Sequence, residues 1–126
     1  MVRSEYMNEN SSEILGIARF KIHEGKLEEY KRLSAKAMEI VRAREPGTLQ
    51  YDTYFNDDES ECVIIERYRD SDAAMEHAAN LNEVSAAVLE AVTVVHGEVL
   101  GAASPELRRR LEGIKVPTLF TLYESL

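Results

Sequence analysis

His77 is the side chain of this sequence that is best suited to acid–base chemistry. Ala74, Ala78 and Leu81 share one helical stripe with it, so the ring should point from a helix towards the protein interior. An imidazole titrates near pH ~6.5 and exchanges protons under neutral conditions. A lone histidine on an apolar stripe is also often a structural residue that hydrogen-bonds a backbone carbonyl, so both interpretations stay open at this point.

Two strands and a turn must position this helix. Pro46-Gly47 is a breaker pair, and residues 48–55 after it are rich in the β-branched and aromatic side chains that suit a strand. Residues 56–60 are polar and predict a turn, and residues 62–68 return as a second short apolar strand. Asp70-Ser71-Asp72 then offers a hydroxyl or a carboxylate to cap the start of the helix. The hairpin therefore leads directly into the helix.

The remaining pattern completes a recognisable order of elements. Residues 14–23 predict a first strand, residues 26–44 an amphipathic helix, and residues 93–100 a fourth strand that follows a short helix capped by Asn82. The order is strand, helix, strand, strand, helix, strand. It predicts an α+β fold, a ferredoxin-like split βαβ arrangement with an antiparallel sheet that helices cover on one side.

A C-terminal helix and strand should extend this core. Ser104-Pro105 is a strong helix start, with a capping hydroxyl followed by proline, and residues 117–122 predict a last strand. That strand either extends the sheet or reaches a partner. We therefore expect one domain at residues 13–126, with a core at 14–100 and an extension at 101–126, after a disordered N-terminal tail at residues 1–12.

Composition excludes several classes of partner. A net charge of −8 would repel a phosphate backbone, so nucleic acid is not expected to bind. Cys62 is the only cysteine, which excludes an intrachain disulfide and fits a small core side chain in a reducing compartment. The sequence has no apolar run of the length that a signal peptide or a bilayer span requires. We expect a soluble, cytoplasmic protein with no membrane partner.

The central strands are apolar on both faces, which bears on assembly. Leu15 and Ile17 alternate with Ile14 and Ala18 in the first strand, and residues 62–65 are apolar without interruption. A sheet with one wet face would instead alternate apolar and polar side chains. A second sheet should therefore cover the free face, and a second copy of the chain is its simplest source, so we expect a homodimer.

Three short motifs follow one another in the middle of the chain. They are Pro46-Gly47-Thr48-Leu49-Gln50-Tyr51, Ile65-Glu66-Arg67-Tyr68-Arg69-Asp70 and Glu76-His77. This ordered set resembles the antibiotic biosynthesis monooxygenase domain family, and the likeness extends over residues 14–100. The resemblance implies a dimeric α+β barrel. It also implies an oxygenase that needs no metal or flavin and that uses dioxygen to oxidise an aromatic, quinol-like or polyketide-like small molecule.

The resemblance also implies roles for particular residues. In such oxygenases the deprotonated substrate itself reduces dioxygen, so the protein must supply an apolar slot, a proton acceptor and hydrogen-bond donors. His77 is the expected catalytic base, and burial is expected to lower its pKa. Six further residues are expected to bind the substrate: Tyr51 and Tyr68 through their hydroxyls, Phe20 and Met38 as walls, Asn82 as a polar contact, and Glu66 as a second base.

The chain departs from its relatives at some of these positions. Tyr68 stands where many relatives have tryptophan, a second histidine near Asn82 is missing, and Ala18 holds the place of an asparagine that haem-degrading relatives need. Haem breakdown is therefore disfavoured. A pocket with fewer polar groups is also consistent with an alternative function, that of a non-catalytic dimeric small-molecule-binding or stress-response protein of the same fold.

The spacing and number of the metal-ligating residues give no reason to expect a cofactor. His23, His77 and His96 have no spacing that suggests a shared metal, and one cysteine cannot form a thiolate cluster. We therefore expect the protein to work without metal, flavin or haem.

Overall fold

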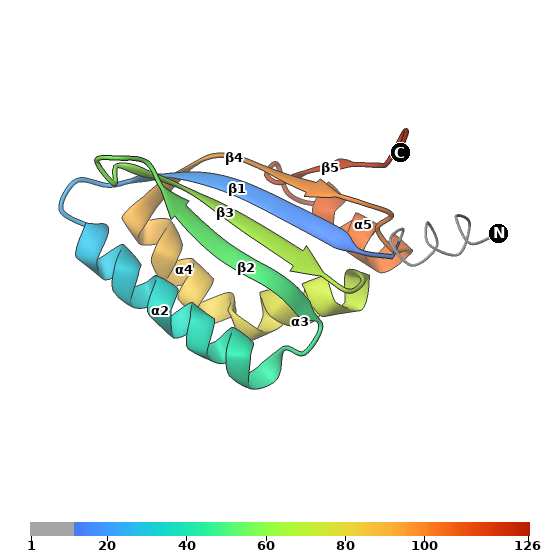
Figure 1. Cartoon of the computed structure of the whole chain (residues 1–126), viewed down its shortest axis with the longest axis horizontal. Coiled ribbons are helices and arrows are strands. Elements are labelled where there is room, and N and C mark those ends of the chain that lie inside the picture. The colour runs from blue at the N-terminus through green and yellow to red at the C-terminus, as the bar shows by residue number, and fades with distance from the viewer. Residues whose placement is uncertain (1–11) are drawn as a thin grey trace.

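Nine segments of regular structure make up residues 12–126, the part of the chain that the computed structural model describes (Figure 1). They are β1 (Ile14–Ile22), α2 (Leu27–Arg44), β2 (Thr48–Phe55), β3 (Glu61–Tyr68), α3 (Ser71–Asn80), α4 (Asn82–Ala91), β4 (Val92–Leu100), α5 (Pro105–Glu112) and β5 (Thr118–Phe120). This order confirms the α+β, ferredoxin-like fold with its C-terminal helix and strand. The tail expected at residues 1–12 lies, apart from Ser12, outside the described residues.

The strands form a single sheet in the order β2-β3-β1-β4-β5. Pairing is antiparallel throughout β2, β3, β1 and β4, as expected, and β5 joins the edge of β4 in parallel. The last strand therefore extends the sheet of its own chain. In the part of the chain that the structure describes, no helix is both long and apolar enough to cross a membrane.

The two faces of the sheet have different surroundings. Figure 1 shows α2, α3 and α4 on one side of the sheet, where they cover it as a layer. Ala18 and Ile64 pair across β1 and β3 and point to this helical side, so their neighbours Ile17, Val63 and Ile65 point to the other side. Those three apolar side chains are only half-buried. The free face therefore presents apolar surface along its central strands.

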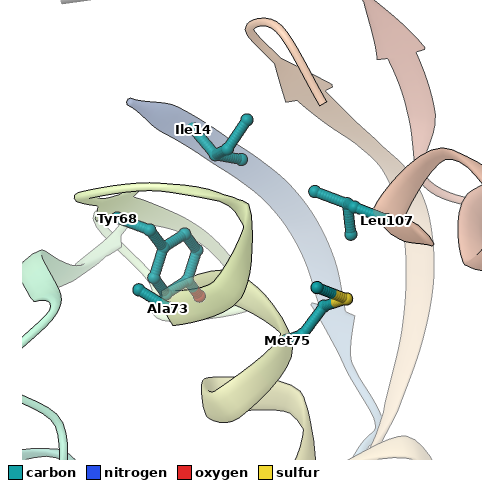
Figure 2. Packing of buried hydrophobic residues seen from close by; sticks show 5 residues of the cluster. All are labelled: Ile14, Tyr68, Ala73, Met75 and Leu107. Atoms are coloured by element: carbon teal, nitrogen blue, oxygen red, sulfur yellow. The ribbon is translucent and has the colours of Figure 1, made fainter. Parts of the chain in front are cut away.

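The core between sheet and helices consists of three clusters of buried side chains. Figure 2 shows the cluster that joins α3 and α5 to β1 and β3, formed by Ile14, Tyr68, Ala73, Met75 and Leu107. Burial of a large apolar side chain contributes about 1.5–3 kcal/mol each. This cluster therefore anchors the C-terminal extension to the same helix that carries the candidate site.

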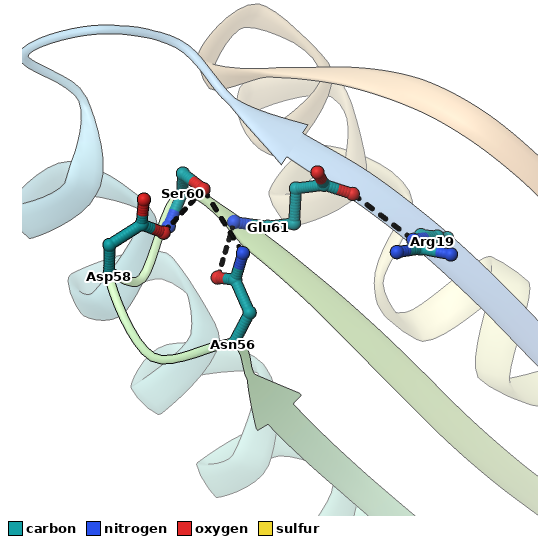
Figure 3. Close-up of polar contacts among 5 residues, drawn as sticks. All are labelled: Arg19, Asn56, Asp58, Ser60 and Glu61. Atoms are coloured by element: carbon teal, nitrogen blue, oxygen red, sulfur yellow. Dashed lines mark hydrogen bonds and ion pairs between the residues drawn. The ribbon is translucent and has the colours of Figure 1, made fainter.

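Polar contacts close the β2–β3 hairpin and fix its register (Figure 3). The Asp58 carboxylate accepts hydrogen bonds from the Ser60 amide at 3.0 Å and the Ser60 hydroxyl at 2.6 Å. The Asn56 side chain accepts from the Glu61 amide at 2.9 Å, and Glu61 forms an ion pair with Arg19 of β1 at 3.1 Å. Because side chains alternate along a strand, a shift of one residue here would turn every β2 side chain to the opposite face.

The helix starts agree with the sequence in two of three cases. Asp70 caps α3 by accepting from the Ala73 amide at 2.9 Å, and Ser104 caps α5. The prediction that Asn82 caps α4 is wrong. Leu81 donates to the His77 carbonyl and its own carbonyl accepts from Ser85, so backbone hydrogen bonds run on from α3 into α4 and leave Asn82 exposed.

We predict that Gly47→Ala destabilises the fold. An added Cβ would lie 2.7 Å from the Ala73 Cβ and 3.4 Å from the Arg69 guanidinium, so β2 and α3 would have to separate. Overpacking of this kind costs about 1–3 kcal/mol, measurable by urea unfolding. Gly113→Ala is the control, because its Cβ would meet only the Arg110 carbonyl at 3.8 Å. Equal stability of the two variants would contradict the prediction.

Candidate functional site

His77 lies between two carboxylates that come from different elements. Its Nδ1 is 2.8 Å from Glu45 Oε1, and its Nε2 is 3.0 Å from Glu66 Oε1. The ring is 10% exposed, the Glu66 side chain 22% and the Glu45 side chain 1%. Both ring nitrogens are therefore engaged by carboxylates.

Local structure explains how the three residues meet. Glu45 is the residue at which α2 ends, just before the Pro46-Gly47 turn leads into β2. Glu66 lies on β3 with its side chain towards the helices, and His77 lies in the last turn of α3. A helix C-terminus favours a positive side chain, so the backbone of α3 adds to the attraction of the two carboxylates.

The Glu45 carboxylate is held by three hydrogen bonds. Oε1 accepts from His77 and from the Thr48 hydroxyl at 2.8 Å, and Oε2 accepts from the Asn80 amide at 3.1 Å. Burial alone would raise the pKa of Glu45. The donated hydrogen bonds outweigh it and hold the pKa below the ordinary value, so the group is an anion at neutral pH.

Two tyrosine rings pack against the imidazole. The centroid of Tyr51 lies 5.1 Å from that of His77 in an edge-on arrangement, and that of Tyr68 lies 5.2 Å away. Burial, followed by the charge of Glu66, raises the pKa of both phenols well above the ordinary value. Their hydroxyls therefore stay protonated and can act as donors but not as bases.

The expected lowering of the His77 pKa is wrong. Burial does lower it, but the hydrogen bonds and charges of Glu66 and Glu45 raise it by more, so the pKa lies above the ordinary value. The sequence argument took burial into account, but it did not place Glu45 or Glu66 in contact with the ring. The two carboxylates therefore favour the protonated form of the ring, the imidazolium, more than water does.

A cavity of about 240 Å³ opens beside this cluster, between the sheet and helices α2 and α4. Its walls are mainly apolar or aromatic, with hydroxyls from Ser34, Thr53 and Ser85 among them. The lining residues are Ala18, Phe20, Tyr30, Ser34, Ala37, Tyr51, Thr53, Ile64, Glu66, His77, Leu81, Val84, Ser85, Val88 and Leu89. An apolar slot with few polar groups on its wall is typical of small-molecule sites.

The structure brings together four of the seven residues that the sequence nominated. His77, Glu66, Tyr51 and Phe20 line the cavity. Tyr68 is buried and lies against His77, where it supports the ring without lining the cavity.

Two nominated residues lie elsewhere. Met38 follows Ala37 on α2, and this one-residue step turns its side chain out of the cavity into a shallow groove that it shares with Lys31 and Tyr54. Asn82 is exposed at the start of α4. The structure therefore does not bring Met38 and Asn82 together with the nominated residues that line the cavity.

Sequence reasoning missed Glu45, which lies 32 residues before its partner His77. A glutamate in front of Pro-Gly looks like an ordinary helix end, and no spacing marks it. It also missed Tyr30, whose hydroxyl accepts from the Cys62 thiol at 3.4 Å. The prediction that Cys62 is a small buried core residue is confirmed.

Side chains of the metal-ligating types are not gathered into a metal site in the described part of the chain. Among residues 12–126, no group of three or more His, Cys, Asp and Glu side chains is placed to hold a metal ion. His23 bonds the Glu90 carbonyl and Thr93, and His96 bonds Glu98, so neither lies with His77.

Solved structures share this fold over most of the chain. MupZ from Pseudomonas fluorescens is 27% identical, over 91% of this chain and 93% of that one, with a TM-score of 0.79. Rv0793 from Mycobacterium tuberculosis is 30% identical, over 74% and 97%, with a TM-score of 0.64. SnoaB, a cofactor-independent oxygenase from Streptomyces nogalater, is 22% identical, over 74% and 95%, with a TM-score of 0.62, which shows the fold alone.

The sequence itself points to the same family. No curated protein matches the chain. Residues 14–94 match the family described as antibiotic biosynthesis monooxygenase, and they include β1 to α4 and with them the Glu45, Glu66 and His77 cluster. Because this match spans more than half of the sequence and agrees with the fold, the chain belongs to the antibiotic biosynthesis monooxygenase family.

Proposed function

We propose that the chain is a cofactor-independent monooxygenase that acts on an aromatic, quinol-like or polyketide-like small molecule. Family membership supports a monooxygenase-like role, and SnoaB, which has the same fold, is a cofactor-independent oxygenase. The observation that carries the proposal is the His77–Glu66 pair, 3.0 Å apart, on the wall of a largely apolar cavity. We expect it to act in the cytoplasm, as the sequence suggested.

The charge of the cluster favours a particular kind of ligand. The two carboxylates of the cluster disfavour a ligand carboxylate or phosphate and favour a neutral ring that donates a hydroxyl hydrogen bond. Glu66 lines the cavity and carries an acceptor carboxylate, so a substrate hydroxyl would donate to it. Phe20 and Tyr51 supply the flat aromatic walls on which such a ring packs.

The oxidation needs no electron source beyond the substrate. A hydroquinone and dioxygen together give a hydroxyquinone and water, so one oxygen atom enters the ring and the other leaves as water. Hydroxylation of a ring carbon supplies two electrons, and oxidation to the quinone supplies two more, which balances the four that dioxygen takes up. The protein has to remove the first hydroxyl proton and hold the anion beside dioxygen.

Glu66 and His77 together would take up that proton. Both nitrogens of a protonated ring are occupied, so the pair accepts a substrate proton only after His77 has lost one. The substrate proton then passes to Glu66 and on to Nε2, and the imidazolium that forms lies between two carboxylates. Transfer to a positioned base of this kind contributes about 10²–10⁴-fold in rate.

The alternative function keeps one observation in its favour. Both ring nitrogens of His77 contact carboxylates of the chain itself, an arrangement that also suits a structural imidazole in a non-catalytic binding protein. Ligand binding without oxygen consumption by the parent protein would identify this alternative.

We also propose that the working unit is a homodimer. The half-buried side chains of Ile17, Val63 and Ile65 lie on the sheet face that the helices leave uncovered. A second copy packed sheet to sheet would cover them. Together with dioxygen and the aromatic ligand, this second copy completes the expected set of partners.

The first prediction concerns the pair itself. With 1,4-naphthohydroquinone as the probe, His77→Ala and Glu66→Gln are each expected to lower the enzyme-dependent rate of oxygen consumption by about 10²-fold or more. Glu61→Gln is the matched control, because it makes the same change on the same strand outside the cavity. A folded His77→Ala variant with the parent rate would contradict the proposed base, and one that unfolds would favour a structural role.

A second prediction follows from the raised pKa of His77. The rate with the same probe, measured as kcat/KM, should be low in acid and rise with pH as the imidazolium loses a proton. The midpoint should lie above ~6.5, the ordinary histidine value. A rate that is fully developed below that pH would show that His77 takes no part in proton uptake.

A third prediction tests the dimer. Sedimentation of the parent protein at micromolar concentration should show a dimer, whose permanent-type interface would bury more than ~2,000 Å² in total. Ile65→Glu puts a charge on the free face and should yield monomers. Ala86→Glu adds the same charge at an exposed position of α4 and should leave the dimer intact. A stable parent monomer would overturn this part of the proposal.

A further inference from the structure

We propose that Glu45 is a positioning residue of this site, which keeps a proton on His77 Nδ1 and thereby reserves Nε2 for proton exchange with Glu66 and the cavity. Glu45 does not line the cavity and acts only through the imidazole. Its effect on catalysis rests on the proposed function. Its effect on the ring is a property of the folded protein and can be measured without turnover.

Burial and hydrogen bonding make Glu45 a fixed acceptor. Its side chain is 1% exposed, and its two oxygens accept from His77, Thr48 and Asn80. These three donors come from α3 and β2, so the carboxylate cannot swing away without breaking contacts to both elements. A ring held on one side by such a carboxylate has a defined orientation and a defined proton position.

Glu66 competes with Glu45 for the proton of the neutral ring. The groups that face His77 are Glu45 from the end of α2, Glu66 and Tyr68 from β3, and Tyr51 from β2. Neither tyrosine is charged at neutral pH, so the choice lies between the two carboxylates. The contact with Glu45 is the shorter one, at 2.8 Å against 3.0 Å for Glu66. The Glu45 side chain is also less exposed to solvent, at 1% against 22%.

These differences give the neutral ring one preferred tautomer. An ion–dipole contact is stronger where solvent is excluded, so the proton should stay on Nδ1 beside Glu45. Nε2 then carries a lone pair directed at Glu66, along the line by which a substrate proton would arrive. The arrangement uses the same principle as a hydrolase triad, in which a buried carboxylate holds the imidazole in the reactive tautomer.

The first experiment observes the tautomer in the unaltered protein. The nitrogen NMR chemical shifts of His77 are assigned by comparison with His77→Gln, whose spectrum lacks them. They are then followed as the pH is raised through the pKa of the ring. The neutral ring should show a protonated Nδ1 and an unprotonated Nε2. The opposite tautomer, or an equal mixture of the two, would overturn the proposal whether or not the protein turns over any substrate.

The second experiment removes the charge and keeps the shape. Glu45→Gln should lower the His77 pKa and disturb the tautomer, because an amide can donate to Nδ1 as well as accept from it. With 1,4-naphthohydroquinone, kcat should fall about 10²-fold or more, while KM stays near the parent value. Glu39→Gln makes the same change at an exposed position of α2 and should alter neither the pKa nor kcat.

The outcomes separate this inference from the proposed function. If the parent protein shows the expected tautomer but consumes no oxygen, the positioning role of Glu45 is supported and the proposed oxygenase function is contradicted. If Glu45→Gln turns over substrate normally and the His77 pKa is unchanged, the oxygenase function stands and the positioning role of Glu45 is contradicted. If Glu45→Gln does not fold, the tautomer of the unaltered protein still decides the question.

Discussion

The contact on which the site depends is the pair of hydrogen bonds that hold His77 between Glu45 and Glu66. It joins the end of α2, the centre of β3 and the last turn of α3, so it fixes two helices against the sheet at one point. A buried ion pair is in general a weak source of stability, because desolvation offsets most of the attraction. The cluster therefore fits the proposed role in proton uptake better than a role in stabilising the core.

The same contact makes stability depend on pH in a defined direction. The pKa of Glu45 is lowered by folding, so its contribution is complete above ~4.3 and is lost as pH falls through the folded value. The pKa of His77 is raised by folding, so its contribution is complete below ~6.5 and is lost as pH rises through the folded value. The two stabilise most fully between these limits. The proposed catalysis needs the neutral ring, which is favoured only above that range.

Local patterns predicted the fold well because local physics decides most of it. The β2 bounds and the Asp70 cap follow from strand propensity, the Pro-Gly break and the needs of a helix end, all of which act over a few residues. The site was harder to predict because it is a tertiary contact. Nothing near Glu45 shows that α2 will end beside α3. The sign of the His77 pKa shift depends on the contacts with Glu66 and Glu45, which no spacing in the sequence reveals. Met38 lies outside the cavity for a smaller reason, because it is one step around the helix from Ala37.

The position of the site also depends on contacts that have no part in its chemistry. Glu66 lies opposite Tyr51 in the β2–β3 pairing, and the polar turn around Asp58 keeps that register. At the other end of the hairpin, Gly47 has no Cβ, and this lets the start of α3 approach β2 closely. The cap at Asp70 sets the residue at which the helix begins. Because side chains advance by about 100° per residue along a helix, these constraints on the start of α3 decide that its last turn directs His77, and not a neighbour, at the carboxylates.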